Sequence, residues 1–577
     1  MASLLSGGMR RTSRKRVSLV DDEFSSSDDD DFALDDSDGS GESAEEFESS
    51  SDSDLSGDEV PASARDWTKV DTTNPPRAPP RFPFTATPGV SAGLDENDTL
   101  DAVGYLELLL SPDVMTQIVK ETNRYADQHL ATAPISRGSR VKAWKPVTEA
   151  EMKVFFALLL LQGIVDKPVV EWYWSKRRVI ETPVFGEVMS KSRFILLMKF
   201  LHFANNEDDA GEVGQARQKL RKIWPVLSLM KERFKASYMP EENISIDESL
   251  MLYKGRLFWK QFLPLKRSRF GVKFYVLCEA ASGYIWDVVI YTGKGTDVDG
   301  QASTMGTKVV MRLMEPLLDQ GYCLTVDNFY TSPELVEKLL SRKTDVYGTV
   351  RPSRKDMPPL KDANLKKGDI VAYQRGKCMA LQWRDKKLVT LLSTVHGATM
   401  TEMVNRKKET VSKPAVVIDY NHTMGGVDKS DQMLSYYPTT RSRQKIYYKK
   451  IFRHLLDMAA FNAFLLYQKQ DGKLSHLEFR LALVEGMVQK YHDPNRTLKK
   501  GRPSDTSLLR LTARHFVSYI PPTPGKELPT RRCVVCCKAR GGGDKKVRKE
   551  TRYWCKDCGV GLCAIPCFEV YHTKAQF

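Results

Sequence analysis

The chain has 577 residues and a mass of 65.5 kDa, which is enough for several hydrophobic cores, and its net charge is +14. Residues 1–16 contribute +5 and residues 17–60 contribute −18, so residues 61–577 carry +27. A positive charge of this size indicates a protein that binds a polyanion, rather than one whose basic residues only form a solvated surface. The longest apolar run, residues 154–161, is too short to span a bilayer and no signal peptide is visible, so we exclude a membrane protein and a secreted one and expect a soluble intracellular protein.

The first 240 residues divide into an acidic part and a helical part. Residues 1–95 are rich in Ser, Asp, Glu and Pro and have too little apolar surface to offset the entropy of ordering, so we predict a disordered acidic N-terminal region. A basic cluster within residues 10–16 matches a nuclear import signal and predicts a location in the nucleus. Residues 96–240 carry apolar residues at spacings of three and four, as in residues 149–164. This spacing predicts a helical domain, which either docks on DNA or has a purely structural role.

From residue 241 the apolar period changes to two, which indicates β-strands. Over residues 241–350 the predicted order is three strands, a helix, a strand, a helix and a strand. This is the order of an α/β RNase H-like fold, and it places the first and fourth strands side by side. Residues 351–411 are polar and basic and interrupt the unit as an insertion. The chain returns to the unit in residues 412–439 and is helical again over residues 440–520.

Acidic residues stand where three of these elements begin or end. Asp247 follows the apolar residues of the first strand, and Asp327 follows the fourth. Asp428 and Asp431 lie three residues apart, hence on one face, in an expected helix. Taken singly, an Asp after a strand is more often a turn or cap residue. Together these carboxylates repel one another unless a cation lies among them, and the simplest interpretation is a two-metal Mg²⁺ or Mn²⁺ site for phosphodiester chemistry.

Residues 531–577 form a Cys/His-rich segment. In a reducing compartment, paired cysteines two residues apart indicate zinc rather than disulfides. The candidate ligands are Cys533, Cys536, Cys555, Cys558, Cys563, Cys567 and His572. Two zinc ions need eight ligands, and the eighth is Cys537, a water or an uncounted residue, unless a single zinc is bound. The interleaved basic residues that we expect to contact DNA phosphates are Arg531, Arg532, Lys545, Lys546, Arg548 and Lys549.

Several ordered motifs make the chain recognisable over about residues 96–577. The motifs SIDE around Asp247, TVDNFYTS around Asp327 and GGVDKSDQ around Asp428 are accompanied by GRLFWKQFLP, KRSRFGVKFY and YGTVR, and the set resembles the piggyBac family of DNA transposases. The resemblance implies an RNase H-like catalytic domain split by an insertion, and a helical dimerisation and DNA-binding domain made from both flanks. It also implies a cross-brace zinc finger with two zinc ions that recognises transposon ends. The implied activity is cut-and-paste transposition at TTAA sites through hairpin ends, by a homodimer or larger assembly on double-stranded DNA.

Carried over by position, the resemblance makes Asp247, Asp327 and Asp428 the metal-binding catalytic carboxylates, and Asp431 supports the same site. The family commonly carries Trp in a segment near KIYYKK, where we predict that Tyr447 stacks on an unpaired base; the alternative is a core aromatic. Two other functions remain open. One is a domesticated DNA or chromatin binder without strand cleavage, and the other is a ubiquitin ligase with a RING-like C-terminus, which would leave the carboxylates unexplained.

Overall fold

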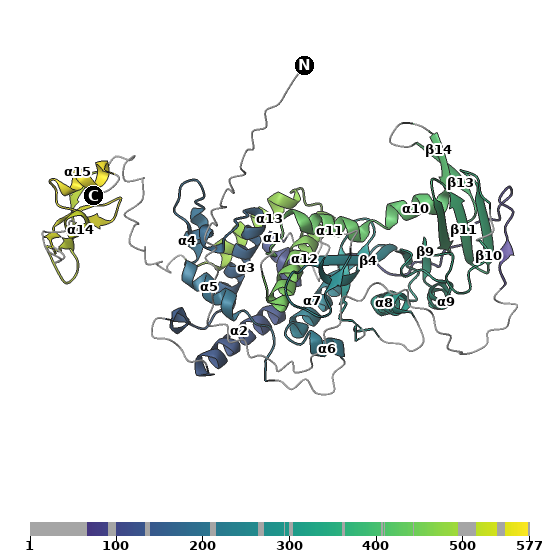
Figure 1. Cartoon of the computed structure of the whole chain (residues 1–577), viewed down its shortest axis with the longest axis horizontal. Helices are drawn as coiled ribbons and strands as arrows, with labels where there is room; N and C mark the ends of the chain where they lie inside the picture. The colour runs from purple at the N-terminus through teal and green to yellow at the C-terminus, as the bar shows by residue number, and fades with distance from the viewer. Residues whose placement is uncertain are drawn as a thin grey trace, which may run out of the picture. The chain divides into compact units, whose positions relative to one another are not determined.

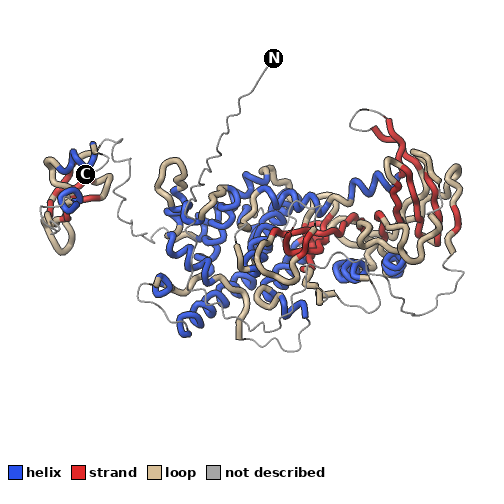
Figure 2. Tube along the Cα trace, viewed as in Figure 1, coloured by secondary structure: helices blue, strands red, loops and turns tan. Residues whose placement is uncertain are grey.

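The computed structural model describes residues 66–90, 100–132, 139–207, 215–263, 270–293, 295–298, 304–360, 364–404, 408, 410–441, 444–493, 515–538 and 548–574. Figure 1 labels many of the helices and strands along these stretches, and Figure 2 distinguishes helix from strand. Residues 1–65, which we predict to be disordered, lie outside the described residues. None of the helices within the described stretches is long and apolar enough to cross a membrane.

Helices from before and after the sheet pack into one helical unit. They are α1 (Ala102–Leu109), α2 (Pro112–Thr132), α3 (Glu149–Ile164), α4 (Pro183–Val188), α5 (Lys191–Phe200), α6 (Gln215–Lys219), α7 (Trp224–Ser237), α12 (Tyr447–Lys469) and α13 (His476–Tyr491). The helix α13 packs against α3, and α1 packs against both α12 and α13. Buried residues lie on every side of α12, which therefore occupies the centre of this core. The start of α13 is fixed by a capping box between Ser475 and Glu478.

A mixed sheet joins this helical unit. Its central elements are β4 (Asn243–Leu252), β5 (Gln261–Phe262), β6 (Phe270–Glu279), β7 (Ile285–Ile290), α8 (Met305–Met314), β8 (Cys323–Val326), α9 (Pro333–Ser341) and β9 (Asp345–Thr349). The strands lie in the order β7, β6, β4, β8, β9; the first three are antiparallel, and β4, β8 and β9 are parallel. Ile246 of β4 lies opposite Val326 of β8. The predicted adjacency of the first and fourth strands is confirmed.

The strands of the predicted insertion continue the same sheet. They are β10 (Ile370–Arg375), β11 (Cys378–Arg384) and β12 (Leu388–Ser393), followed by the hairpin β13 (Met400–Val404) and β14 (Thr410–Pro414). Because Leu391 of β12 pairs with Thr349 of β9, the insertion shares its hydrogen-bonded sheet with the central strands. The chain then forms α10 (Ala415–Thr423) and α11 (Gly426–Tyr436), and α11 packs across β4 and β6.

Residues 66–90 correct the prediction that all of residues 1–95 are disordered. They form an extended segment in which β1 (Thr68–Lys69) pairs with β10 and β2 (Gly89–Val90) pairs with β3 (Tyr238–Met239). Between the two strands, the ring of Phe84 packs edge-on against Tyr322 at a centroid distance of 5.0 Å. The average composition of this region is poor in apolar residues, but an aromatic anchor and backbone pairing at both ends hold the segment in place.

The described residues of the C-terminal module start at residue 515, inside the predicted helical span 440–520 and before the predicted boundary at 531. Its elements are β15 (Val517–Tyr519), β16 (Arg531–Arg532), α14 (Val534–Lys538), β17 (Glu550–Thr551), β18 (Tyr553–Cys555), β19 (Val560–Gly561) and α15 (Cys567–Thr573). The strand β15 pairs with β18, so residues assigned to the preceding helical domain belong to this module. Its small core is built largely from cysteine side chains together with Val534, Leu562 and Tyr571.

Candidate active site and metal centres

The end of β8 brings two predicted carboxylates together. Val326, the last residue of β8, pairs in parallel with Ile246, so Asp327 and Asp247 lie at the same level along the two strands. The first strand does not end at Asp247 as predicted, because β4 continues to Leu252. Carboxylate oxygens of Asp247, Glu248 and Asp327 all lie within 4.8 Å of one another. Glu248 stands next to Asp247 in the same sequence motif, but it is not among the predicted site residues.

The helix α11 lies along the same face of β4 as Asp247. Gly426 approaches so closely that a Cβ there would lie 2.5 Å from Ser245 Oγ and 3.1 Å from the Glu279 carbonyl oxygen, so a side chain at this position would force Ser245 to move. Farther along, Ser249 Oγ donates to Asp431 Oδ1 at 2.5 Å. Because Ser245, Asp247 and Ser249 alternate along one face, the two contacts bracket Asp247.

Asp428 and Asp431 stand outside the group of three carboxylates. Asp428 lies in the first turn of α11, is exposed, and precedes Asp431 by one turn of the helix. Burial raises the pKa of Tyr420 in α10 to about 12, and the carboxylates of Asp327, Asp247 and Asp428 act in the same direction. The three predicted carboxylates therefore act electrostatically on one hydroxyl, although the structure brings only two of them into direct proximity.

The acidic group contains a lysine that sequence reasoning missed. Lys273 Nζ lies 2.9 Å from Glu248 Oε1. Burial raises the pKa of Asp327, and the charge of Glu248 raises it further. The backbone N–H of Phe329, which donates to Asp327 Oδ1 at 2.9 Å, and the ammonium of Lys273 both oppose that rise. The carboxylate oxygens of Asp247 and Asp327 are ligands that suit a hard divalent cation such as Mg²⁺ or Mn²⁺.

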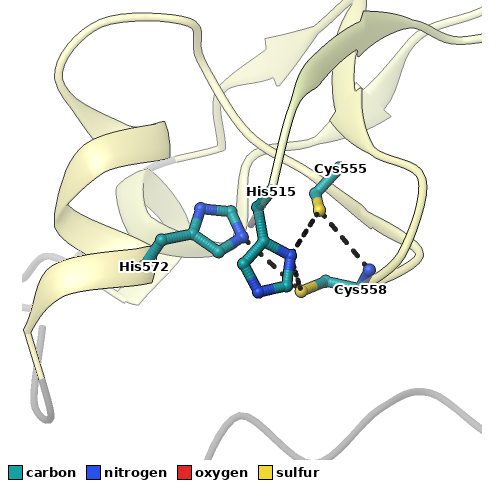
Figure 3. Close-up of side chains that lie close together, drawn as sticks. All are labelled: His515, Cys555, Cys558 and His572. Carbon is teal, nitrogen blue, oxygen red and sulfur yellow. Dashed lines mark hydrogen bonds between the residues drawn. The ribbon is translucent and has the colours of Figure 1, made fainter. Parts of the chain in front are cut away.

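The C-terminal cysteines and histidines form two groups of four. One contains Cys533, Cys536, Cys563 and Cys567, and the other contains His515, Cys555, Cys558 and His572. The ligand atoms of each group lie within 4.8 Å of one another, and Figure 3 shows the second group. Along the chain the two groups alternate, which is the order of a cross-brace. The donor sets, four thiolates in one group and two thiolates with two imidazoles in the other, fit structural zinc.

The spacing within each group matches a tetrahedral ion. Two sulfurs that each lie about 2.3 Å from a tetrahedral zinc are about 3.8 Å apart. Cys536 Sγ lies 3.8 Å from Cys563 Sγ and 3.3 Å from Cys567 Sγ. In the second group Cys558 Sγ lies 3.5 Å from His572 Nε2, while His572 Nδ1 lies 2.7 Å from the Phe568 carbonyl oxygen. A bond from Nδ1–H to that carbonyl would put the lone pair of the ring on Nε2, the atom that faces Cys558 Sγ and could bind the ion.

His515 is the eighth residue, and sequence reasoning did not count it. Its Nδ1 lies 3.4 Å from Cys555 Sγ and 3.6 Å from Cys558 Sγ. Cys537, which we had considered for this place, is in neither group. The only available signal was a single histidine upstream of the first cysteine pair, and β15 carries it into the module.

The structure describes four of the six basic residues of the C-terminal module that we predict to contact DNA phosphates. Arg531, Arg532, Arg548 and Lys549 are exposed. The Arg531 guanidinium lies over the ring of Trp554 at 4.7 Å. Lys545 and Lys546 lie outside the described residues.

Tyr447 is partly buried and packs against the hydrophobic core. Its hydroxyl donates to the Lys219 carbonyl at 3.1 Å, and its ring packs edge-on against the buried Trp259. Burial raises its pKa to about 12. The geometry favours the core aromatic that we had weighed as the alternative.

Comparison with known proteins identifies the family. A family model described as Transposase IS4 matches residues 101–464. The human PiggyBac transposable element-derived protein 3 is 29% identical over 487 residues, covering 81% of this chain and 76% of the relative, and the human PiggyBac transposable element-derived protein 2 is 24% identical, covering 76% and 73%. The cryo-EM structure of a piggyBac transposase synaptic complex with hairpin DNA superposes with a TM-score of 0.63 at 21% identity, covering 84% of this chain and all of that one. The chain therefore belongs to the piggyBac-type transposase family.

Proposed function

We propose that this protein is a metal-dependent DNA transposase that excises a transposon through hairpin ends and inserts it at TTAA sites. The observation that carries the proposal is the convergence of Asp247, in the middle of β4, and Asp327, immediately after β8, beneath the helix that bears Asp428. The order and directions of the five central strands support an RNase H-like catalytic domain. We place the protein in the nucleus, acting on double-stranded DNA as a homodimer or larger assembly.

In this proposal Asp247, Asp327 and Asp428 hold two divalent ions, Mg²⁺ or Mn²⁺. When bound, the ions stabilise the attacking and leaving oxygens of an in-line displacement at phosphorus. The protein contributes the placement of the carboxylates. The Phe329 N–H orients Asp327, and Ser249 fixes Asp431 next to the same face of β4. The close contact of Gly426 with Ser245 holds the start of α11, and with it Asp428, against the sheet.

The C-terminal module contributes DNA recognition in the same proposal. Two zinc ions hold a small unit whose core otherwise has few apolar residues, so that zinc binding supplies its folding free energy. The exposed cations of β16 and of residues 548–549 face solvent and suit contacts with DNA phosphates. The related cryo-EM structure is a complex with hairpin DNA, which supports DNA as the partner of this chain.

A plasmid excision assay with Mg²⁺ and candidate transposon ends tests the proposal. Asp247→Asn, Asp327→Asn and Asp428→Asn should each abolish excision while leaving binding to the ends largely intact, because each removes a metal ligand and its charge. Glu334→Gln is the matched control, since it removes one carboxylate from a surface pair with Lys338 on α9. An Asp327→Asn protein that still cuts would remove this residue from the site.

A second candidate, a DNA or chromatin binder without strand cleavage, is favoured by the names of the human relatives, which describe them as transposable element-derived. The same assay separates the two functions. Wild-type protein that binds transposon ends but releases no excised DNA, in Mg²⁺ or Mn²⁺, would support the second.

A further inference from the structure

Glu248 and Lys273 form an ion pair on the side of the sheet opposite α11. Glu248 pairs with Tyr275 across β4 and β6, and Leu250 pairs with Lys273, so these four residues share one face. Lys273 Nζ lies 2.9 Å from Glu248 Oε1, and the two side chains are only 9% and 16% exposed. A largely buried ion pair is costly to form, because both charges lose water, and it has to be maintained by its surroundings.

Two aromatic rings fix the position of the ammonium. Lys273 Nζ lies 4.6 Å from the ring centroid of Tyr275 and 4.8 Å from that of Phe329, and the two rings are within 15° of parallel. Such cation–π contacts strengthen when the cation is desolvated. The backbone N–H of Phe329 also donates to Asp327. The lysine is thus connected to β4 through Glu248 and to the end of β8 through Phe329.

We propose that Lys273 is a positioning residue of the catalytic centre: a fixed cation, tethered by Glu248, that lets the carboxylates of Asp247 and Asp327 lie close together before metal binds. Glu248 serves as the counter-ion of the lysine and is not a metal ligand. This inference rests on the proposed function, because it assigns the carboxylates to a metal site. The small exposure of Lys273 argues against a direct contact with DNA phosphates, which would need an accessible ammonium.

The two members of the pair should shift metal affinity in opposite directions. A positive charge near a divalent ion repels it, and Coulomb repulsion between the two, even with water-like screening, corresponds to on the order of a tenfold change in affinity. Lys273→Met should therefore bind Mn²⁺ about tenfold more tightly than wild type, and Glu248→Gln should bind it more weakly by a similar factor. The double variant Glu248→Gln/Lys273→Met and the conservative Lys273→Arg should both stay within about threefold of wild type.

The experiment is a titration of the purified full-length chain with Mn²⁺, without DNA, in which free Mn²⁺ is measured by electron paramagnetic resonance. Thermal unfolding in a chelator confirms that each variant is folded. The double variant keeps the test valid if a single variant fails to fold, because it leaves no unpaired buried charge. A double variant as weak as Glu248→Gln would make Glu248 a metal ligand and overturn the inference, as would unchanged affinity in both single variants.

Different experimental results would refute the role of Lys273 and the proposed transposase function. Wild-type protein that binds Mn²⁺ but excises no DNA refutes the function and leaves the opposed shifts measurable. Active wild-type protein whose two single variants shift affinity in the same direction refutes the inference alone. Wild-type protein that binds no Mn²⁺ overturns both.

Discussion

Replacing His515 by alanine tests the two-centre geometry of the C-terminal module. Its Nδ1 lies 3.4 and 3.6 Å from the sulfurs of Cys555 and Cys558, so it closes the second group of four ligands. Structural zinc in small domains binds with about 10–16 kcal/mol of free energy. If four ligands share it evenly, one ligand contributes about 3 kcal/mol, and its loss weakens binding at this centre about 100-fold.

The assay is the zinc content of the purified full-length chain after dialysis against a chelator of intermediate affinity, measured by mass spectrometry. Wild type should keep two zinc ions per chain and His515→Ala should keep one. The matched control is Cys537→Ser, because Cys537 is adjacent to a ligand but belongs to neither group. It should keep two.

The opposite pattern would refute this reasoning. If His515→Ala keeps two ions while Cys537→Ser loses one, the eighth ligand is Cys537 and the approach of β15 to the module has been misassigned. If both variants keep two ions, a water molecule completes the second centre.

Two further predictions concern the helical unit. Burial lowers the pKa of His202 to about 3, below the ordinary value of about 6.5, so the unfolded chain binds this proton more tightly. The free energy of unfolding should therefore fall as the pH drops from about 6.5 towards 3, by at most about 1.4 kcal/mol per pH unit from this group, and His202→Gln should flatten the slope in urea titrations at pH 7 and pH 5. Arg480 and Asp457 form a buried pair at 2.8 Å, and Arg480→Met should destabilise the protein by about 3–5 kcal/mol in the same titrations, because it leaves a buried carboxylate unpaired. A loss below about 1 kcal/mol would show that Asp457 is stabilised by other groups.

The meeting of Asp247 and Asp327 was predictable because it needs only local information. Alternating apolar residues indicate two strands, and an aspartate follows the apolar residues in each. The order of elements places those strands side by side, and the observed pairing of Ile246 with Val326 confirms it. Each aspartate stands next to the apolar residues of its strand, and a single sequence reveals that pattern, although β4 continues past Asp247 to Leu252.

Residues held by long-range register could not be found in this way. Lys273 is 25 residues from Glu248, and their contact depends on how β6 pairs with β4. His515 is 40 residues from Cys555 and reaches the second centre only because β15 pairs with β18. Each of these residues is an ordinary Lys or His in its own stretch of sequence. Its role comes from a strand pairing that no local pattern specifies.

The cation among the crowded carboxylates is not only a divalent metal. We reasoned that crowded carboxylates require a cation among them, and concluded that the cation is a divalent metal. The structure adds a cation that belongs to the chain, because Lys273 is paired with Glu248 next to Asp327. With three carboxylates and one ammonium, the local charge before metal binds is −2 rather than −3. Because the Lys273 ammonium neutralises part of the negative charge, the carboxylates can stay close together without metal. The remaining negative charge still attracts divalent ions.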